Sequence, residues 1–410
     1  MHSSVHKPAT AMHIGWLAAV LWIATRVIML ALAAKFPGAS GDVTYYFAGI
    51  TQPDGQSLTE YPVLGLLPIW LATHLPLFYP DHALIAFVCV MLAYDAAFFA
   101  FLLSRTTCIR NRILAASFWL IFPLTVGPVF VYRLDVFPAV VVGLGLWALA
   151  THPRMAGALF AIATWIKLWP GILVTTCITS WRNLIWLKRF VAFGLTFVCI
   201  GICTALLTSP SRMFSPLVYQ QDRGLQIESL AATFLLYRAH TTAHDRYSIT
   251  YAASKSFEIT GPGVEFALQM TSIGMLLLVA ACCVWALAIF VKGGSRLPDP
   301  SYVILSIVLL LIVVNKVFSP QYIIWLGPIL AVILLRAPQR ITLGLAIATL
   351  MVAGISQLIY PVYYDDLLIL GESQSPVVIL LVVRNIIIVG MTIITVMNAY
   401  RTTRAYLQQP

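Results

Sequence analysis

The chain has 410 residues, of which 60% are apolar and only 10% are charged, with a formal net charge of +10 and a mean hydropathy of +0.90. A soluble protein of this length has too much surface to cover with so few charged residues. The composition therefore excludes an ordinary soluble domain and predicts a polytopic helical membrane protein. The positive charge then concerns orientation in the bilayer, and no basic face interleaved with aromatic residues points to nucleic acid.

Apolar runs recur along the whole chain at the length that a membrane span requires, which is about 20 residues. We expect a single transmembrane domain over residues 1–410, all-α, with both termini in the cytoplasm. The expected segments are 13–34, 82–104, 113–131, 135–150, 155–167, 169–181, 189–208, 264–291, 301–315, 321–336, 342–360 and 376–399. The first run is too long for a cleaved signal peptide, and its removal would leave an odd number of spans.

Residues 155–181 can be interpreted as one helix or as two short helices that turn at Trp169-Pro170. Proline breaks the helical hydrogen-bond ladder, and broken helices occur where backbone lines a polar cavity. The two-helix interpretation also returns Arg182, Lys188 and Arg189 to the inner side, so it is preferred.

With this topology, fourteen Lys and Arg residues lie on the inner side against nine on the outer side, where thirteen of the fifteen acids also lie. An excess of Lys and Arg marks the cytoplasmic side. The two long connections, 35–81 and 209–263, are therefore expected on the extracytoplasmic face of the plasma membrane. Long loops usually carry function, and the apolar run after Glu60 is too short to span, which favours an interfacial helix.

Charged residues within or at the edge of a bilayer are costly and usually functional. The polar candidates of the outer half are Asp42, Glu60, Tyr61, Arg133, Asp135, Lys167, Arg223, Glu228, Lys316 and Gln321. Some have a simpler explanation. Arg133 and Asp135 could be interfacial anchors, and the ammonium of Lys167 could lie among the lipid headgroups while its aliphatic chain stays in the apolar region. Three mid-span residues are expected to pair for structure alone: Arg26, Asp95 and Arg384.

One or two carboxylates together with several cations suit a lipid-linked phosphate donor. Lys or Arg can neutralise a leaving phosphate at headgroup level, and a carboxylate can take the proton from an incoming hydroxyl. The expected phosphate and headgroup ligands are Arg133, Lys167, Arg223 and Lys316. No nucleotide-binding glycine motif is present in a plausible context. The spacing of His240 and His244 resembles a metal pair, but both lie in a polar loop, so neither a metal nor a cofactor is predicted.

Six stretches between about residues 40 and 330 carry a family resemblance. In chain order they are GDVTYY, EYPV, YRLDVFPA, AIATWIKLWPGIL, DRGLQIES and NKVFSPQYIIWLGP. Together they resemble the polyprenyl-phosphate-mannose-dependent α-mannosyltransferases, actinobacterial members of the C-type (multi-span) glycosyltransferase superfamily. The resemblance implies a GT-C-type helical bundle whose first outer loop carries the catalytic acid, which falls on Asp42 as general base. It also implies inverting, metal-independent transfer of mannose from a polyprenyl-phosphate donor to a glycolipid or lipoglycan acceptor.

The chain departs from that family at one motif. Some members carry histidine after the Ser-Pro of the NKVFSPQY stretch, whereas this chain has Gln321-Tyr322 there. A phosphate-binding histidine therefore does not carry over, and Lys316 is the candidate left in its place.

Two alternatives stay open. Related enzymes of the family use a polyprenyl-phosphate arabinofuranose donor, and no residue excludes that sugar. Twelve spans with a broken helix also suit a secondary transporter. Transporters generally place polar groups at mid-membrane in two similar halves, whereas here the polar residues crowd toward one side, which favours the enzyme.

Overall fold

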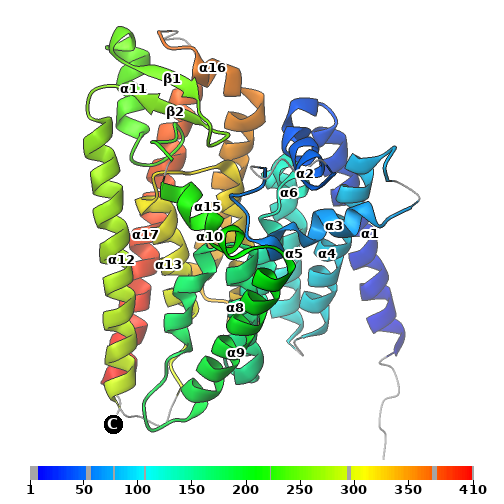
Figure 1. Cartoon of the computed structure of the whole chain (residues 1–410). Helices are drawn as coiled ribbons and strands as arrows, with labels where there is room; N and C mark the ends of the chain where they lie inside the picture. Colours follow the sequence, from blue (N-terminus) through cyan, green and yellow to red (C-terminus); the bar gives the residue numbers. More distant parts are fainter. Residues whose placement is uncertain are drawn as a thin grey trace, which may run out of the picture.

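The computed structural model describes residues 8–51, 57–76, 79–105, 108–221, 223–292, 297–371 and 376–408, with side chains from residue 15 onward. Five of the charges used to predict the topology lie outside these residues: Lys7, Asp54, Asp222 of the DRGLQIES stretch, Arg296 and Glu372. Helices run between two ends of an elongated bundle, and a cap of shorter elements covers one end (Figure 1).

Seven helices of the described part are long and apolar enough to cross a membrane by length and composition. They are α1 (Pro8–Ala33), α4 (Ala83–Ser104), α5 (Ile109–Val126), α9 (Ile185–Leu207), α12 (Val264–Lys292), α15 (Arg340–Gln357) and α17 (Val377–Leu407). A helix satisfies its backbone groups internally, as the hydrocarbon core requires. A mostly helical membrane protein is thus confirmed, whereas the count of twelve spans stays a prediction.

Shorter apolar helices form the centre of the bundle. These are α7 (Val136–Ala148), α8 (Pro153–Ile166), α13 (Ser301–Val314) and α14 (Leu326–Arg336). Most side chains of α7, α13 and α14 are buried, whereas α9 and α12 bury only a few of theirs. A helix packed against protein on all sides touches little lipid, so its length need not match the thickness of the bilayer.

Three expected helices are interrupted. The run 113–131 divides into α5 and α6 (Pro128–Tyr132) at Gly127, whose φ of +68° suits glycine. The run 169–181 is a 3₁₀ helix, η3 (Trp169–Cys177), and 321–336 begins as the 3₁₀ helix η5 (Pro320–Trp325). Each interruption lies next to a proline, which removes a backbone donor.

The chain reverses direction between α8 and η3, as the two-helix interpretation requires. Arg189 of α9 donates hydrogen bonds both to the carbonyl oxygen of Leu149, just before α8, and to that of Cys177, at the end of η3. The beginning of α8 and the end of η3 therefore lie together, and Lys167 occupies the turn at the opposite end.

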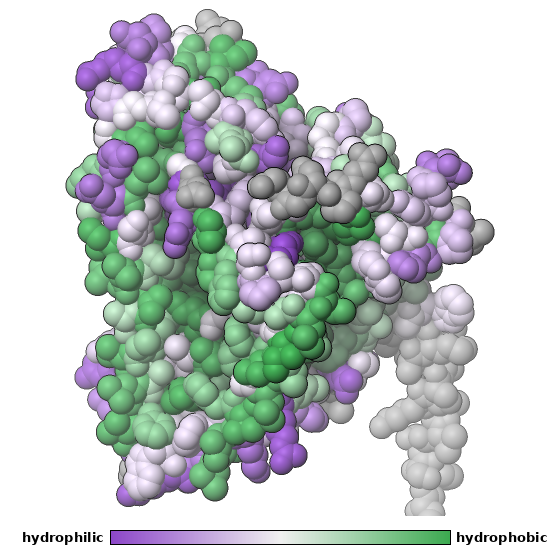
Figure 2. All heavy atoms as spheres, in the orientation of Figure 1, coloured by the Kyte–Doolittle hydropathy of each residue, from purple (hydrophilic) through white to green (hydrophobic). Residues whose placement is uncertain are grey.

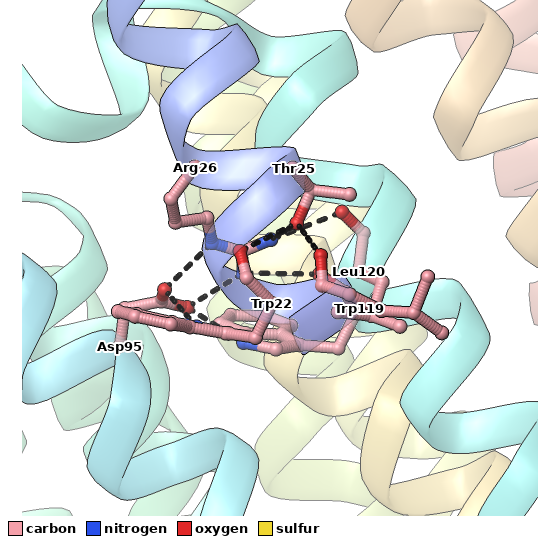
Figure 3. Close-up of polar contacts among 7 residues, drawn as sticks. Trp22, Thr25, Arg26, Asp95, Trp119 and Leu120 are labelled. Atoms are coloured by element: carbon pink, nitrogen blue, oxygen red, sulfur yellow. Dashed lines mark hydrogen bonds and ion pairs between the residues drawn. The ribbon is translucent and has the colours of Figure 1, made fainter. Parts of the chain in front are cut away.

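A buried ionic network ties α1 to α4 and α5 (Figure 3). The guanidinium of Arg26 donates to both carboxylate oxygens of Asp95 at 2.8 and 2.9 Å and to the carbonyl oxygens of Trp119 and Leu120. The indoles of Trp22 and Trp119 donate to the same carboxylate at 2.7 and 2.8 Å. This pairing of two mid-span charges fixes α1, and α1 leads directly into the first loop.

The described residues of the first loop form four short helices. They are η1 (Pro37–Ser40), α2 (Gly41–Thr51), η2 (Val63–Leu66) and α3 (Leu67–Thr73). The last two cover the apolar run after Glu60, where a short helix was expected. Gly65 lies so close to the end of α8 that a Cβ there would be 2.4 Å from the carbonyl oxygen of Ile166.

The second loop folds into the cap. It contains α10 (Pro210–Gln221), α11 (Thr233–Thr241), η4 (His244–Arg246), β1 (Ser248–Tyr251) and β2 (Phe257–Thr260). The two strands pair antiparallel with Ser248 opposite Thr260 and form a short hairpin within a mostly helical chain, as expected for the all-α class. Leu236 and Ile259 of the cap pack with Leu367 of α16 (Tyr364–Leu368), which follows the π-helical turn η6 (Leu358–Val362).

An apolar belt separates two polar ends (Figure 2). Asp42 contacts Arg133, just before α7, whereas the stretch 181–189 lies beside Leu149, after α7. Asp42 is therefore at the opposite end of the bundle from Arg182 and Lys188, as expected. Which end faces the cytoplasm stays a prediction.

Candidate functional site

A cavity of about 250 Å³ lies between the cap and the adjacent end of the bundle. Eight of the ten residues selected from the sequence line it: Asp42, Glu60, Tyr61, Arg133, Lys167, Arg223, Glu228 and Gln321. Asp135 lies directly behind Lys167. Lys316 is not among the lining residues, and its ammonium donates to the carbonyl oxygen of Gln221 at 3.1 Å. Residues from both loops and from three further connections thus meet in one place.

Asp42 presents a carboxylate to this cavity from the first turn of α2, where the helix dipole favours an acid. Its Oδ2 lies 2.9 Å from Nη1 of Arg133, and its side chain is 42% exposed. Arg133 is held in turn by the carbonyl oxygen of Ala39 at 3.4 Å and the hydroxyl of Tyr360 at 3.3 Å. The guanidinium predicted as a phosphate ligand therefore orients the carboxylate.

Lys167 reaches the cavity from the turn between α8 and η3. Its Nζ donates to Oδ1 of the wholly buried Asp135 at 2.6 Å, and the indole of Trp325 donates to the same oxygen at 2.6 Å. The ammonium also lies 5.4–6.0 Å from the ring centroids of Tyr61, Tyr322 and Trp325. An ammonium has three donors, so this anchoring leaves hydrogens for a ligand in the cavity.

Glu60 is the second carboxyl of the first loop at the cavity. Burial raises its pKa above the ordinary value, against the effect of a hydrogen bond from Tyr45 and the charge of Arg212. The hydroxyl of Tyr45 donates to Oε2 of Glu60 at 3.3 Å and accepts the N–H of Leu58 at 2.9 Å. Glu60 therefore keeps its proton to a higher pH than an exposed glutamate.

The cap supplies further cations. Arg223 donates to the hydroxyl of Ser256 at 3.0 Å and lies over the ring of Tyr219. Lys255, at the tip of the hairpin, is exposed and also lines the cavity. Glu228, by contrast, forms an ion pair of 2.7 Å with Arg384, and both side chains are buried. That pair fastens the cap to α17.

Sequence reasoning missed several lining residues. They are Tyr45, Tyr219, Tyr251, Ser254, Lys255, Ser256, Tyr360 and Tyr364, among others. The stretches SITY and FEIT alternate apolar and polar residues and are rich in β-branched and aromatic side chains. This pattern is the signal of a hairpin and could have directed attention to the residues at its tip.

The two histidines of the cap face different surroundings. His240 is buried and contacts the carbonyl oxygen of Leu367 at 3.2 Å through Nε2, whereas His244 is exposed. No group of three or more His, Cys, Asp or Glu side chains placed to hold a metal ion occurs within the described ranges.

No protein-family model, curated protein or solved structure matches the chain. What the cavity can do must therefore be read from its own groups. Asp42 can accept a proton, Lys167 and Arg223 can bind an anion, and the surrounding tyrosines offer hydroxyls and ring faces. This set suits a phosphorylated ligand and a hydroxyl that reacts with it.

Proposed function

We propose that this protein is a membrane glycosyltransferase of the GT-C type, which transfers a sugar from a polyprenyl-phosphate donor to a glycolipid or lipoglycan acceptor. Mannose is the first candidate for the sugar, because of the motif resemblance described above. One observation carries the proposal: a carboxylate, Asp42, and an ammonium, Lys167, line the same cavity at one end of an apolar bundle. A lipid-linked donor would place its phosphate at that depth.

In the proposed reaction, Asp42 accepts the proton of an acceptor hydroxyl while the oxygen attacks the anomeric carbon. The bond from that carbon to the phosphate oxygen breaks, and polyprenyl phosphate leaves with the electron pair. Lys167 and Arg223 stabilise the charge on the departing phosphate. One displacement inverts the anomeric configuration, and a single base is sufficient because the phosphate needs no proton to leave.

An apolar groove of about 480 Å³ beside the cap offers a place for a lipid chain. Leu230, Met270, Val313 and Val389 are among its lining residues. It also includes Asn385, whose side-chain amide donates to the carbonyl oxygen of Glu228 at 3.4 Å, next to the cavity. A lipid held there would have its headgroup end close to the cationic groups.

The deciding experiment uses the purified full chain in detergent without an ion or substrate gradient. It is incubated with labelled polyprenyl-phosphate mannose or arabinofuranose and a panel of acceptors, and the products are identified by mass spectrometry. Transfer that is lost in Asp42→Asn supports the proposal and names the sugar. Donor binding without any consumption, together with uptake into vesicles under a gradient, would favour the transporter instead.

A further inference from the structure

A tight turn over residues 58–61 brings Glu60 and Tyr61 to the cavity. The backbone conformation of its first residue is unfavourable. Leu58 has a φ of +60°, in the left-handed region that a leucine rarely adopts. Its side chain is 2% exposed, and its N–H is bound by the hydroxyl of Tyr45 at 2.9 Å. The hydroxyl of Tyr45 therefore holds the turn from the side of α2, and the N–H of Tyr61 closes it by donating to the carbonyl oxygen of Leu58 at 3.2 Å.

Arg212 of α10 binds the turn from the side of the cap. Its Nη2 donates to the carbonyl oxygens of Leu58 at 2.8 Å and Tyr61 at 2.9 Å. Its Nη1 donates to the hydroxyl of Ser215 at 2.6 Å, and Ser215 donates to the carbonyl oxygen of Thr59 at 2.9 Å. Three carbonyl groups of the four-residue turn are therefore bound by one helix of the cap.

The same face of α10 also contacts the hairpin tip, which lines another side of the cavity. Tyr219 follows Arg212 by seven residues, a spacing that places both on one side of a helix. Its hydroxyl donates to the carbonyl oxygen of Ser254, at the tip of the hairpin. The opposite side of α10 exposes Phe214, Leu217 and Val218. Thus α10 links the Glu60 turn to the hairpin tip.

We propose that Arg212 is a positioning residue for the transfer reaction, which holds the 58–61 turn so that Glu60 and Tyr61 face the substrate. This inference rests on the proposed glycosyltransferase function. Arg212 is not among the residues that line the cavity, so it acts through the turn and does not bind the donor phosphate. A planar guanidinium can donate to two carbonyl groups at fixed angles, which a lysine ammonium reproduces only in part.

The test compares Arg212→Gln and Arg212→Lys with a matched control, Arg238→Gln. Arg238 is another arginine of the cap, and its guanidinium lies over the ring of Phe234, away from the cavity lining. Two readouts are taken on each full-length protein: deuterium uptake of the peptide over residues 57–62, and kcat and KM for the donor. The first readout requires no substrate.

In Arg212→Gln we expect faster uptake at 57–62 and a kcat lowered about 10- to 100-fold with an unchanged donor KM, as for a misplaced group near the reaction centre. Arg212→Lys should be intermediate, and Arg238→Gln should match the wild type. If Arg212→Gln does not fold, Ser215→Ala is used instead. It removes the Thr59 contact and the acceptor of Arg212 Nη1 but keeps both Nη2 contacts, so it should change both readouts in the same direction to a smaller extent.

Unchanged uptake, or faster uptake with a kcat within twofold of the wild type, would overturn the inference. A wild-type chain that transfers no sugar from either donor would count against the proposed function instead. The two failures are distinguishable, because the uptake measurement reports on the turn in the absence of any reaction.

Discussion

Lys167 and Asp135 form an ion pair of 2.6 Å at the base of the cavity, although the lysine follows α8 and the aspartate precedes α7. Asp135 is wholly buried, and the Lys167 side chain is 21% exposed toward the cavity. The carboxylate therefore fixes the ammonium where a ligand can reach it. This pair explains how a charged lysine is kept at the end of a largely apolar bundle.

The Lys167 ammonium can be tested against a second lysine of the same end of the bundle. Lys167→Gln keeps a donor for Asp135 but removes the positive charge. We therefore expect kcat/KM for the donor to fall by an amount that corresponds to about 2–4 kcal/mol of lost transition-state stabilisation, as when an oxyanion-binding donor is removed. Lys316→Gln is the matched control, because Lys316 does not line the cavity, and it should change kcat/KM less than about threefold, within the small effect of a surface substitution. Equal losses in the two variants would contradict the assignment.

Asp42→Asn should fold normally, because asparagine is nearly isosteric and can still contact Arg133. We expect the variant to retain donor binding and to lose transfer by about 100-fold or more, the scale of general-base catalysis. Product formation under single-turnover conditions measures the effect, with donor binding measured separately. Full activity in Asp42→Asn, or loss of wild-type activity on treatment with a chelator, would show this mechanism to be wrong.

Gly65 tests how closely the first loop must approach the Lys167 turn. In Gly65→Ala the new Cβ would be 2.4 Å from the backbone oxygen of Ile166, so the loop carrying Glu60 and Tyr61 must shift. We expect lower transfer activity and a lower melting temperature. Gly344→Ala is the control, since a Cβ there meets no atom within 4 Å, and it should stabilise α15 by about 0.5–1 kcal/mol. Unchanged activity in Gly65→Ala would show that the close approach has no functional role.

The network around Arg26 and Asp95 should dominate the stability of the first helix. Asp95→Ala leaves a buried guanidinium without its counter-ion and should cost about 3–5 kcal/mol. The double variant Arg26→Met, Asp95→Leu removes both charges and should cost much less. Thermal unfolding in detergent compares the stability of the wild type, Asp95→Ala and the double variant. A double variant less stable than Asp95→Ala would contradict this account.

Glu60 should give the protein a pH-dependent stability. Burial raises the pKa of Glu60 in the folded state above the unfolded value of about 4.3. The protonated carboxyl therefore contributes its full stabilisation below the unfolded pKa. This stabilisation is lost as the pH rises through the raised pKa of the folded state. Glu60→Gln cannot ionise, so its stability relative to the wild type should increase as the pH rises from 4 to neutrality. Melting temperatures measured across this range check the sign, and a constant difference would exclude the effect.

The long hydrophobic helices and most of the cavity residues could be predicted from the sequence, because both follow from local rules. A run of apolar residues must form a helix in lipid, and a charge in such a chain is too costly to keep without a partner or a function. The break at Lys167-Pro170 was predictable for the same reason, since proline cannot continue the ladder. These rules need no knowledge of which segments pack together.

Only the tertiary structure decided which charges pair. Arg133 was selected as a phosphate ligand but holds Asp42, and Lys316 lies off the cavity. Glu228 lines the cavity, but its carboxylate is paired with Arg384. An ion pair depends on side-chain positions brought together by helices far apart in the chain, and a sequence pattern does not contain those distances. The position of the hairpin tip with Lys255 at the cavity could not be predicted for the same reason. The place of a short strand pair is determined by the surfaces on which it packs.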